Sequence, residues 1–406
     1  METPGTGCSG GIRAKAASGG TPGTSTEEYY MQYRTIQKSG EKLPILGLGC
    51  MRLERTPDGK IDTDAAITMV RNAIKSGASY IDSAWIYHDG DNETVVGTAL
   101  EGEWREKAFL VTKLPSWEVT TRDEMDGYLT EQLRRLGTDY LDAYFLHALT
   151  KDRWDNLVSL GVVDFLNQAK ADGKIRYAAF SFHDTFDAFQ EIIDAYDWDV
   201  CQIQYNYLDE ECQAGTKGLS YAASRDVSVI VMEPLRGGLL STNLPAEATA
   251  ILDAAPVRRT PSEWGLRWVW DHPDVTVVLS GMTSDEQLKE NCQTAEMGIA
   301  GSFLPEDHAI VQQIRDVFNA AIRVPCTRCG YCMPCPSGVN IPECLAQLNN
   351  TSISGDVEYG RFFYDGILIE SGYASLCVQC GACEEKCPQK IRIMDYLQEA
   401  TSLFGR

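Results

Sequence analysis

The chain has 406 residues, of which 44% are hydrophobic and 23% charged, a composition typical of a folded protein with more than one domain. No apolar run approaches the roughly 20 residues that a membrane-spanning helix needs. The net charge of −22 argues against a nucleic-acid partner, because phosphate would be repelled. We therefore predict neither a membrane segment nor a nucleic-acid partner.

Residues 1–30 predict a disordered N-terminal tail. They are mainly Gly, Ser, Thr, Ala and Pro, with few large apolar side chains to offset the entropy lost on ordering. They contain neither the apolar core of a secretion signal nor a twin-arginine motif. With fourteen cysteines in the chain, this indicates a reducing compartment, and we expect a cytoplasmic protein. Met31 begins the first globular-looking segment and is an alternative translation start to Met1.

From residue 45 to about residue 298, short apolar segments alternate with amphipathic segments. The apolar segments are "ILGLG", "SYID", "AFLVTK", "LDAYFLH", "IRYAAFS", "DVCQIQ", "VSVIVMEP" and "VTVVLSG". Three of the amphipathic segments, at 62–77, 121–137 and 154–174, have the pattern of helices. Eight candidate strands with intervening helices match a (β/α)₈ TIM barrel, which we place at residues 31–303 of an α/β protein.

A doubly wound sheet is the alternative fold for this part of the chain. That fold usually carries G-x-G-x-x-G after its first strand, and "GLGCMR" does not complete the motif. Residues 304–324 predict one further helix that connects the barrel to a cysteine-rich region. Residues 325–406 then predict a small, mainly helical domain, in which "GVNIPECLAQLNN" has the pattern of a helix.

Four polar side chains follow the ends of three consecutive predicted strands. Asp82 and Tyr87 follow the second strand, Lys113 ends the third and His147 ends the fourth. Separately, each has an ordinary explanation as a surface ion pair or as a core histidine with its hydrogen bonds made. Because loops at this end of a barrel carry the chemistry, four such groups at matching depth predict a catalytic site.

The segments around these four residues resemble a known enzyme family. "YIDSAWIYHDGDNETVVGTAL", "FLVTKLP" and "LDAYFLHAL" are similar to the catalytic segments of the aldo/keto reductases, and the likeness extends over residues 32–300. The resemblance implies carbonyl reduction, or alcohol oxidation, with a nicotinamide cofactor. Tyr87 would transfer the proton, Lys113 would lower its pKa, Asp82 would hold Lys113, and His147 would orient the carbonyl.

The same resemblance implies a set of cofactor contacts. Ser181 and Gln202 correspond to contacts with the nicotinamide carboxamide, and Met232 takes the place of a tyrosine that often stacks on the ring. The remaining positions are Pro234, Leu235 and Gly237 near the pyrophosphate, and Gly281, Gln287, Glu290 and Asn291 near the adenosine. Basic side chains that would meet a 2′-phosphate are missing at Gly281 and Gln287, which favours NAD, although Arg236 leaves NADP open.

Eight cysteines of the C-terminal region lie in two runs. The runs are Cys326, Cys329, Cys332 and Cys335, and Cys377, Cys380, Cys383 and Cys387. Zinc also binds four cysteines, but usually through two separated C-x₂-C pairs. Three cysteines at successive intervals of three, with a fourth before proline, favour two [4Fe–4S] clusters in which each fourth cysteine ligates the other cluster. Cys335 would then join Cys377, Cys380 and Cys383, and we interpret Cys344 as a core thiol.

The combination resembles a subgroup of aldo/keto reductases with a C-terminal ferredoxin-type domain, and it leaves three functions open. The first is a carbonyl reductase that acts on small carbonyl or alcohol substrates. The second is a reductase that exchanges electrons through its clusters, independently of NAD(P)H, with a ferredoxin or flavoprotein partner. Because nicotinamide transfers two electrons and a cluster transfers one, a direct relay needs a converter such as flavin. The third is a non-catalytic barrel that senses redox state.

Overall fold

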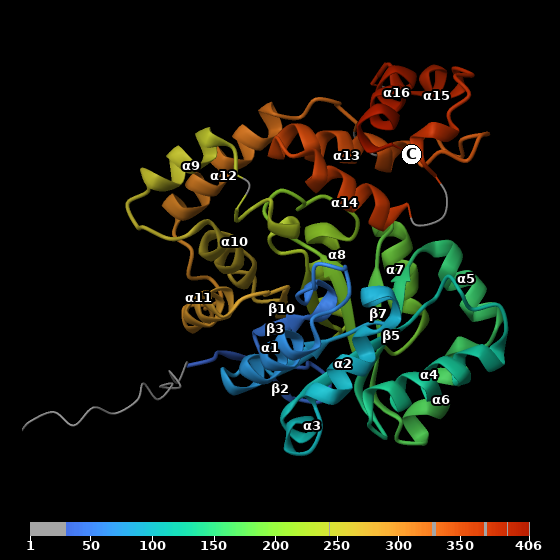
Figure 1. The fold of residues 1–406 in the computed structure, drawn as a ribbon, viewed down its shortest axis with the longest axis vertical. Helices are drawn as coiled ribbons and strands as arrows, with labels where there is room; N and C mark the ends of the chain where they lie inside the picture. Colours follow the sequence, from blue (N-terminus) through green and yellow to red (C-terminus); the bar gives the residue numbers. More distant parts are fainter. Residues whose placement is uncertain (1–29, 243, 327–329, 369–371, 388, 406) are drawn as a thin grey trace, which may run out of the picture.

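The computed structural model describes residues 30–242, 244–326, 330–368, 372–387 and 389–405. The predicted disordered tail therefore lies outside the described residues, apart from Tyr30. Eight parallel strands close into a barrel in the order β10-β3-β4-β5-β6-β7-β8-β9, which confirms the predicted TIM barrel (Figure 1). The strands are β3 (Leu46–Gly49), β4 (Tyr80–Asp82), β5 (Phe109–Leu114), β6 (Leu141–Leu149), β7 (Ile175–Phe182), β8 (Val200–Gln204), β9 (Ser228–Met232) and β10 (Val275–Ser280).

A short antiparallel hairpin precedes the barrel and was not expected from the sequence. It consists of β1 (Tyr33–Thr35) and β2 (Lys42–Pro44). Ile36 and Leu43 belong to the same buried cluster as Tyr80, whose side chain points into the barrel. The hairpin therefore closes the amino-terminal end of the barrel and leaves the opposite end for chemistry.

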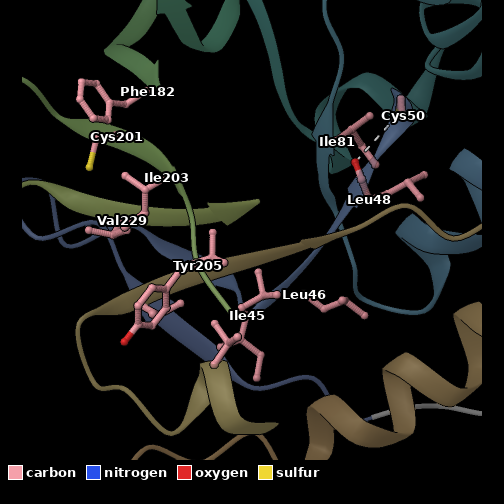
Figure 2. Close-up of a cluster of buried hydrophobic side chains, with 14 of the residues drawn as sticks. Ile45, Leu46, Leu48, Cys50, Ile81, Phe182, Cys201, Ile203, Tyr205 and Val229 are labelled. Atoms are coloured by element: carbon pink, nitrogen blue, oxygen red, sulfur yellow. Dashed lines mark hydrogen bonds between the residues drawn. The ribbon is translucent and has the colours of Figure 1, made fainter. Parts of the chain in front are cut away.

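Side chains alternate between the inside and the outside of the barrel, as the period of a β-strand requires. The outward-facing set, which includes Leu48, Ile81, Cys201, Ile203 and Val229, packs in the layer beneath the helices (Figure 2). The inward-facing set forms a separate cluster made mainly of Tyr80, Phe109, Val111, Ala143, Phe145, Tyr177, Ala179, Val200, Ile230, Val277 and Leu279. The next inward-facing position on each strand consequently lies at the open, carboxyl end.

The outer helices follow the strands along the chain. They are α1 (Thr63–Lys75), α2 (Asn92–Ala99), α3 (Glu103–Lys107), α4 (Arg122–Leu136), α5 (Lys151–Ser159), α6 (Val162–Ala171), α7 (Phe186–Ala195), α8 (Gly215–Ser224), α9 (Ala246–Asp253), α10 (Pro261–Trp270) and α11 (Asp285–Glu296). The helix expected at 154–174 is in fact two helices, because Gly161 adopts a left-handed conformation (φ 80°) that ends one and begins the next.

Helix α12 (Pro305–Ala320) comes after the barrel in the chain and lies against α9 (Figure 1). It ends four residues before the end of the predicted connecting helix. Ile310, Ile314 and Phe318 are buried in the same hydrophobic cluster as the outer layer of the barrel. The helix is therefore packed as part of the barrel, in addition to connecting the barrel to the C-terminal region.

The C-terminal region is mainly helical, as predicted, and has a hydrophobic core of its own. Its helices are α13 (Ile341–Ser354), α14 (Val357–Ile367), α15 (Ala382–Lys386) and α16 (Ile393–Phe404). Cys344 is fully buried in this core, in agreement with its interpretation as a core thiol. Ile353 and Tyr359 instead join the barrel's hydrophobic cluster, so the two parts share an apolar contact. None of the described helices is both long and apolar enough to cross a membrane.

Candidate active site and cofactor cleft

The period of the strands explains why the predicted catalytic residues meet. Asp82, Lys113 and His147 each lie two residues beyond an inward-facing core residue, namely Tyr80, Val111 and Phe145 respectively. Their side chains therefore point to the axis of the barrel at its carboxyl end. Ser181, Gln202 and Met232 occupy the equivalent positions on β7, β8 and β9.

Lys113 is the centre of the polar cluster. Its ammonium donates hydrogen bonds to Asp82 Oδ1 at 2.5 Å, to the Ser83 carbonyl at 2.8 Å and to the Tyr87 hydroxyl at 3.4 Å. The Lys113 side chain is only 1% exposed and that of Asp82 4%. Gln202 donates from Nε2 to the second oxygen of Asp82 at 3.2 Å. A buried charge is stable only when paired and hydrogen-bonded, and each of these contacts meets that need.

Tyr87 and His147 complete the cluster from different elements. Tyr87 begins a short 3₁₀ segment, η2 (Tyr87–Gly90), and its ring centroid lies 6.1 Å from that of His147. The buried His147 Nδ1 has no hydrogen-bond partner among the described residues. Burial and, next, the charge of Lys113 lower the pKa of His147 well below its usual value, so the imidazole is neutral. A neutral imidazole can donate one hydrogen bond without adding charge to the site.

The pKa of Tyr87 corrects one sequence-based expectation. Burial raises this pKa above its usual value of 10.0, and the Lys113 ammonium acts in the opposite direction without overcoming that effect. The influence of Lys113 thus has the expected sign, but the phenol is not more acidic than a free tyrosine. Burial also disfavours the charge of Lys113, yet Asp82 and Tyr87 together raise its pKa above 10.5. At neutral pH the pair therefore consists of an ammonium and a protonated phenol.

A buried amide behind the cluster fixes the loop that carries Tyr87. Asn92 Nδ2 donates to the Cys50 carbonyl at 2.9 Å, and Asn92 Oδ1 accepts from the Ser83 hydroxyl at 2.7 Å. Asn92 Nδ2 also lies 3.0 Å from His88 Nδ1, while His88 Nε2 bonds the Leu53 carbonyl at 3.0 Å. Asn92 was not predicted from the sequence, because an asparagine side chain gives no sequence signal for the groups that it will bond.

A second buried network supports β5 from outside the barrel. The fully buried Glu93 accepts hydrogen bonds from Thr112 at 2.6 Å and from Gln132 at 2.7 Å. Gln132 also donates to the carbonyl of Lys113 at 2.9 Å. Arg135 provides the balancing charge 3.5 Å from Glu93. The backbone that carries Lys113 is therefore held on both of its sides.

The residues expected at the nicotinamide lie around the same end of the barrel. Ser181 Oγ accepts from the Ala148 amide at 2.7 Å, which leaves its own proton available to donate. The Ser181 and Gln202 side chains are buried, and Met232 is partly exposed at the end of β9. The arrangement fits an amide-bearing ring that lies between β7 and β9.

The expected pyrophosphate loop is in contact with the C-terminal region. Gly237 has φ 64°, and a Cβ added there would collide with Phe363 of α14 and lie 2.8 Å from Nη2 of Arg52. The Tyr359 hydroxyl donates to the carbonyl of Arg236 in the same loop. Helix α14 therefore lies against the loop in which a dinucleotide would need space.

Arg52 is a cofactor-side residue that was not predicted from the sequence. Its guanidinium lies 4.8 Å from the ring centroid of Phe362 and 5.7 Å from that of Phe363. Its Cδ is 3.1 Å from where a Cβ on Gly281 would be. The aliphatic part of the Arg52 side chain thus lies beside Gly281, while its guanidinium lies by Gly237 and the two phenylalanines, a cation that the sequence-based preference for NAD did not take into account.

The residues expected at the adenosine are engaged with their own helix or its neighbours. Gln287 Oε1 accepts from the Thr283 amide at 2.8 Å, and Glu290 accepts from the Thr260 hydroxyl. The buried Asn291 donates to Ser280 Oγ at 2.9 Å. Pro234 and Leu235 lie in the loop before η3 (Arg236–Gly238). These contacts hold the adenosine-side residues in place within the barrel.

Four of the predicted cluster cysteines surround one cavity. It is lined by Cys335, Cys377, Cys380 and Cys383, together with apolar side chains that include Ile341, Met394 and Leu397. This is the set expected for one cluster. Of the other set, Cys326 and Cys332 pack against the core of the C-terminal region and Cys387 is buried in it. Cys329 lies outside the described residues.

Comparisons with known proteins agree with both parts of the structure. The model of the "Aldo/keto reductase family" matches residues 45–314, and that of a "4Fe-4S dicluster domain" matches residues 325–391. The chain therefore belongs to the aldo/keto reductase family and carries a C-terminal 4Fe–4S domain. It is an oxidoreductase.

Three similar proteins illustrate the relationship. Methylglyoxal reductase YeaE of Escherichia coli is 29% identical over 68% of this chain and 93% of its own. The NADH-specific methylglyoxal reductase of E. coli is 26% identical over 64% of this chain and 91% of its own. The solved aldo/keto reductase of Klebsiella pneumoniae, in complex with NADP and acetate, is 25% identical with a TM-score of 0.56, over 68% of this chain and 93% of its own.

Proposed function

We propose that the barrel reduces a small carbonyl compound, or oxidises the corresponding alcohol, by hydride transfer with a nicotinamide cofactor. The observation that carries this proposal is the position of the Lys113 ammonium, which bonds both Asp82 and the Tyr87 hydroxyl in a buried site beside His147. Such an arrangement serves a reaction in which an oxygen gains negative charge and then a proton.

In the proposed reaction each residue has a separate task. A bound nicotinamide would supply hydride to the carbonyl carbon, which would leave negative charge on the carbonyl oxygen. Tyr87 donates its proton to that oxygen, because its raised pKa keeps the phenol protonated until a stronger base is adjacent. Lys113 stabilises the resulting phenolate, and Asp82 keeps Lys113 charged and oriented. His147 donates a hydrogen bond that directs the carbonyl toward Tyr87.

We propose Ser181 and Gln202 as contacts of the nicotinamide carboxamide, with Met232 against the ring. Pro234, Leu235 and Gly237 would lie near the pyrophosphate, and Gly281, Gln287, Glu290 and Asn291 near the adenosine. NAD remains our first choice because Gln287 brings no charge. Arg52 beside Gly281, and the NADP of the K. pneumoniae relative, support testing both cofactors.

We propose two [4Fe–4S] clusters in a domain that spans residues 325–406, after a barrel at 31–303 and a connection at 304–324. One cluster would be held by Cys335, Cys377, Cys380 and Cys383, whose shared cavity supports this assignment. The other would be held by Cys326, Cys329, Cys332 and Cys387.

A second function, electron exchange between the clusters and the barrel, is favoured by the contact of α14 with the loop at Gly237. That contact joins the iron–sulfur domain to the place where a redox cofactor would bind. A ferredoxin or a flavoprotein would then be the partner, and a flavin would convert between one- and two-electron steps. The buried Asp82–Lys113 pair argues against a barrel that only senses redox state, because sensing by the clusters does not require a catalytic ion pair in the barrel.

The test uses anaerobic protein with its clusters loaded. Methylglyoxal is supplied with NADH or NADPH, and both nicotinamide oxidation and the visible cluster absorption are followed. We expect turnover with unchanged clusters, and a loss of about 10²–10⁴-fold in Tyr87→Phe. The matched control is Tyr196→Phe, whose hydroxyl bonds Asn167 at the protein surface. Bleaching of the clusters without carbonyl turnover would instead support electron exchange.

A further inference from the structure

One arginine beside the proposed active site has no acidic partner among the described residues. Arg153 lies in the first turn of α5, which directly follows the strand that carries His147 near its end. Its guanidinium donates to the Ala148 carbonyl at 2.6 Å and lies over the ring of Trp117, 5.4 Å from the centroid. The Trp117 ring is in turn 5.2 Å from that of His147. A cation, an indole and the proposed carbonyl-orienting imidazole thus form a continuous row.

Arg153 lacks the ion pair that several other partly buried arginines form. Arg105, Arg135 and Arg259 each form an ion pair with a carboxylate within 3.5 Å. Within the described part of the chain Arg153 forms none, although it is half-buried. Among the described residues, the partly buried Arg34 and Arg71 also lack an ion pair, but they bond three and two backbone carbonyls respectively, whereas Arg153 bonds one and lies beside the proposed active site. A partly buried cation without a counter-ion is costly, unless a ligand supplies the missing charge.

The neighbours of Arg153 leave that charge uncompensated. On the same helix, the Lys151 ammonium pairs with the Asp155 carboxylate at 2.6 Å. The backbone amide of Lys151 donates a hydrogen bond to the Asp184 carboxylate at 2.8 Å. The two histidines within electrostatic reach, His147 and His183, have pKa values lowered mainly by burial, that of His183 to about 4. Both are therefore neutral near pH 7 and add no charge beside Arg153.

We propose that Arg153 binds a carboxylate on the substrate, so that the substrate is an aldehyde or ketone that also carries an acid group. The carbonyl would lie at Tyr87 and His147, the chain of the substrate would cross the face of Trp117, and the carboxylate would meet the guanidinium. Arginine suits this task because its planar fork matches both oxygens of a carboxylate. This inference rests on the proposed carbonyl reduction and names the class of its substrate.

Two probes of equal chain length test the proposal in the complete, cluster-loaded protein. They are 4-oxobutanoate, which has a carboxylate, and butanal, which does not. We expect wild-type kcat/KM to be about 10–100-fold higher for 4-oxobutanoate, as charge-assisted hydrogen bonds allow. Arg153→Met should remove this preference by lowering only the value for 4-oxobutanoate, and Arg153→Lys should restore part of it. Calorimetry should show succinate binding to the wild type and not to Arg153→Met.

The outcomes separate this inference from the function beneath it. If the wild type reduces neither probe nor methylglyoxal, carbonyl reduction itself is wrong. If it reduces both probes equally, or if Arg153→Met lowers both values by the same factor, carboxylate recognition is overturned. Arg153 would then only hold the backbone at Ala148, which has φ 51°.

Discussion

The two sides of the barrel's open end differ in how they are held. Around β4 to β6 most polar groups are satisfied by partners within the barrel, as in the bonds of Lys113 to Asp82, Ser83 and Tyr87. Around β9 and β10 the loop at Gly237 is in contact with Phe363 and Arg52, and Phe363 comes from the C-terminal domain. One side is thus complete within the barrel, whereas the other depends on a second domain.

The proposed proton-donating site and the proposed cofactor-binding side therefore differ in what each needs before the reaction. The site that would donate the proton needs no rearrangement, since its charges and hydrogen bonds already exist in the absence of substrate. On the proposed dinucleotide side, α14 lies against the loop at Gly237, so a cofactor bound there would lie beside a helix of the iron–sulfur domain. The clusters therefore have a physical route by which to affect the barrel even if they pass no electrons to it.

The largest expected effect is on the β4–β6 side, which is complete within the barrel. Lys113→Met should lower the kcat of carbonyl reduction by about 10²–10⁴-fold, because the Tyr87 phenolate loses its counter-ion. It should also cost about 3–5 kcal/mol in the free energy of unfolding, since the buried Asp82 carboxylate loses its counter-ion. Steady-state kinetics and urea denaturation measure the two effects.

The double variant Asp82→Asn/Lys113→Met separates these two losses. With no unpaired charge remaining, stability should largely return, whereas activity should not. Recovery of activity in the double variant would mean that the pair is only structural, and the proposed mechanism would be wrong.

The next effect is on the β9–β10 side, where the loop at Gly237 contacts the C-terminal domain. Phe363→Ala should tighten the binding of NADH or NADPH about tenfold, because the side chain that meets the loop at Gly237 is removed. The matched control is Glu358→Ala on the same helix, since this side chain is exposed and its carboxylate pairs with Arg361. Fluorescence titration gives both dissociation constants. Weaker binding in Phe363→Ala would show instead that α14 forms part of the cofactor site.

A smaller effect is expected from the cluster ligands. Cys380→Ala should reduce iron from about eight to about four atoms per chain, because one of the two proposed clusters loses a ligand. Cys344→Ala is the control, since its thiol is buried in the core and has a pKa that burial raises to about 12. Equal iron in the two variants would contradict the assignment of Cys380 and would remove the proposed link between clusters and α14.

The residues on the β4–β6 side of the barrel's open end could be predicted from the sequence. On the β9–β10 side, the residues that contact the C-terminal domain could not. Asp82, Lys113 and His147 could be predicted from strand period and from resemblance, because a residue at the end of a barrel strand has little choice of direction. Arg52 carries no such signal, since its role comes from Phe362 and Phe363, some 310 residues further along the chain. The β1–β2 hairpin was missed because its strands have three residues each, too few for a recognisable alternation.

The acidity of Tyr87 was also beyond prediction from local rules. The presence of Lys113 near Tyr87 predicted a lowered pKa, but the sequence does not show how completely the phenol is buried. In the structure burial prevails and raises the pKa of Tyr87 above 10.0. The sign of a pKa shift therefore required the packing of the site as well as the identity of its neighbours.

The smallest expected effect is the change in the rate of carbonyl reduction with pH, which follows from this pKa. Reduction needs a proton on Tyr87, so between about pH 6 and pH 9 its rate should change less than about twofold and should fall only above about pH 10. His147 adds no ionisation in this range, because burial keeps its pKa well below 6.5. Alcohol oxidation needs the phenolate and should rise about tenfold per pH unit over the same interval. A fall in the reduction rate already near pH 7 would mean that Lys113 outweighs burial once the cofactor is bound, and the contrast between a preformed and a dependent side would no longer hold.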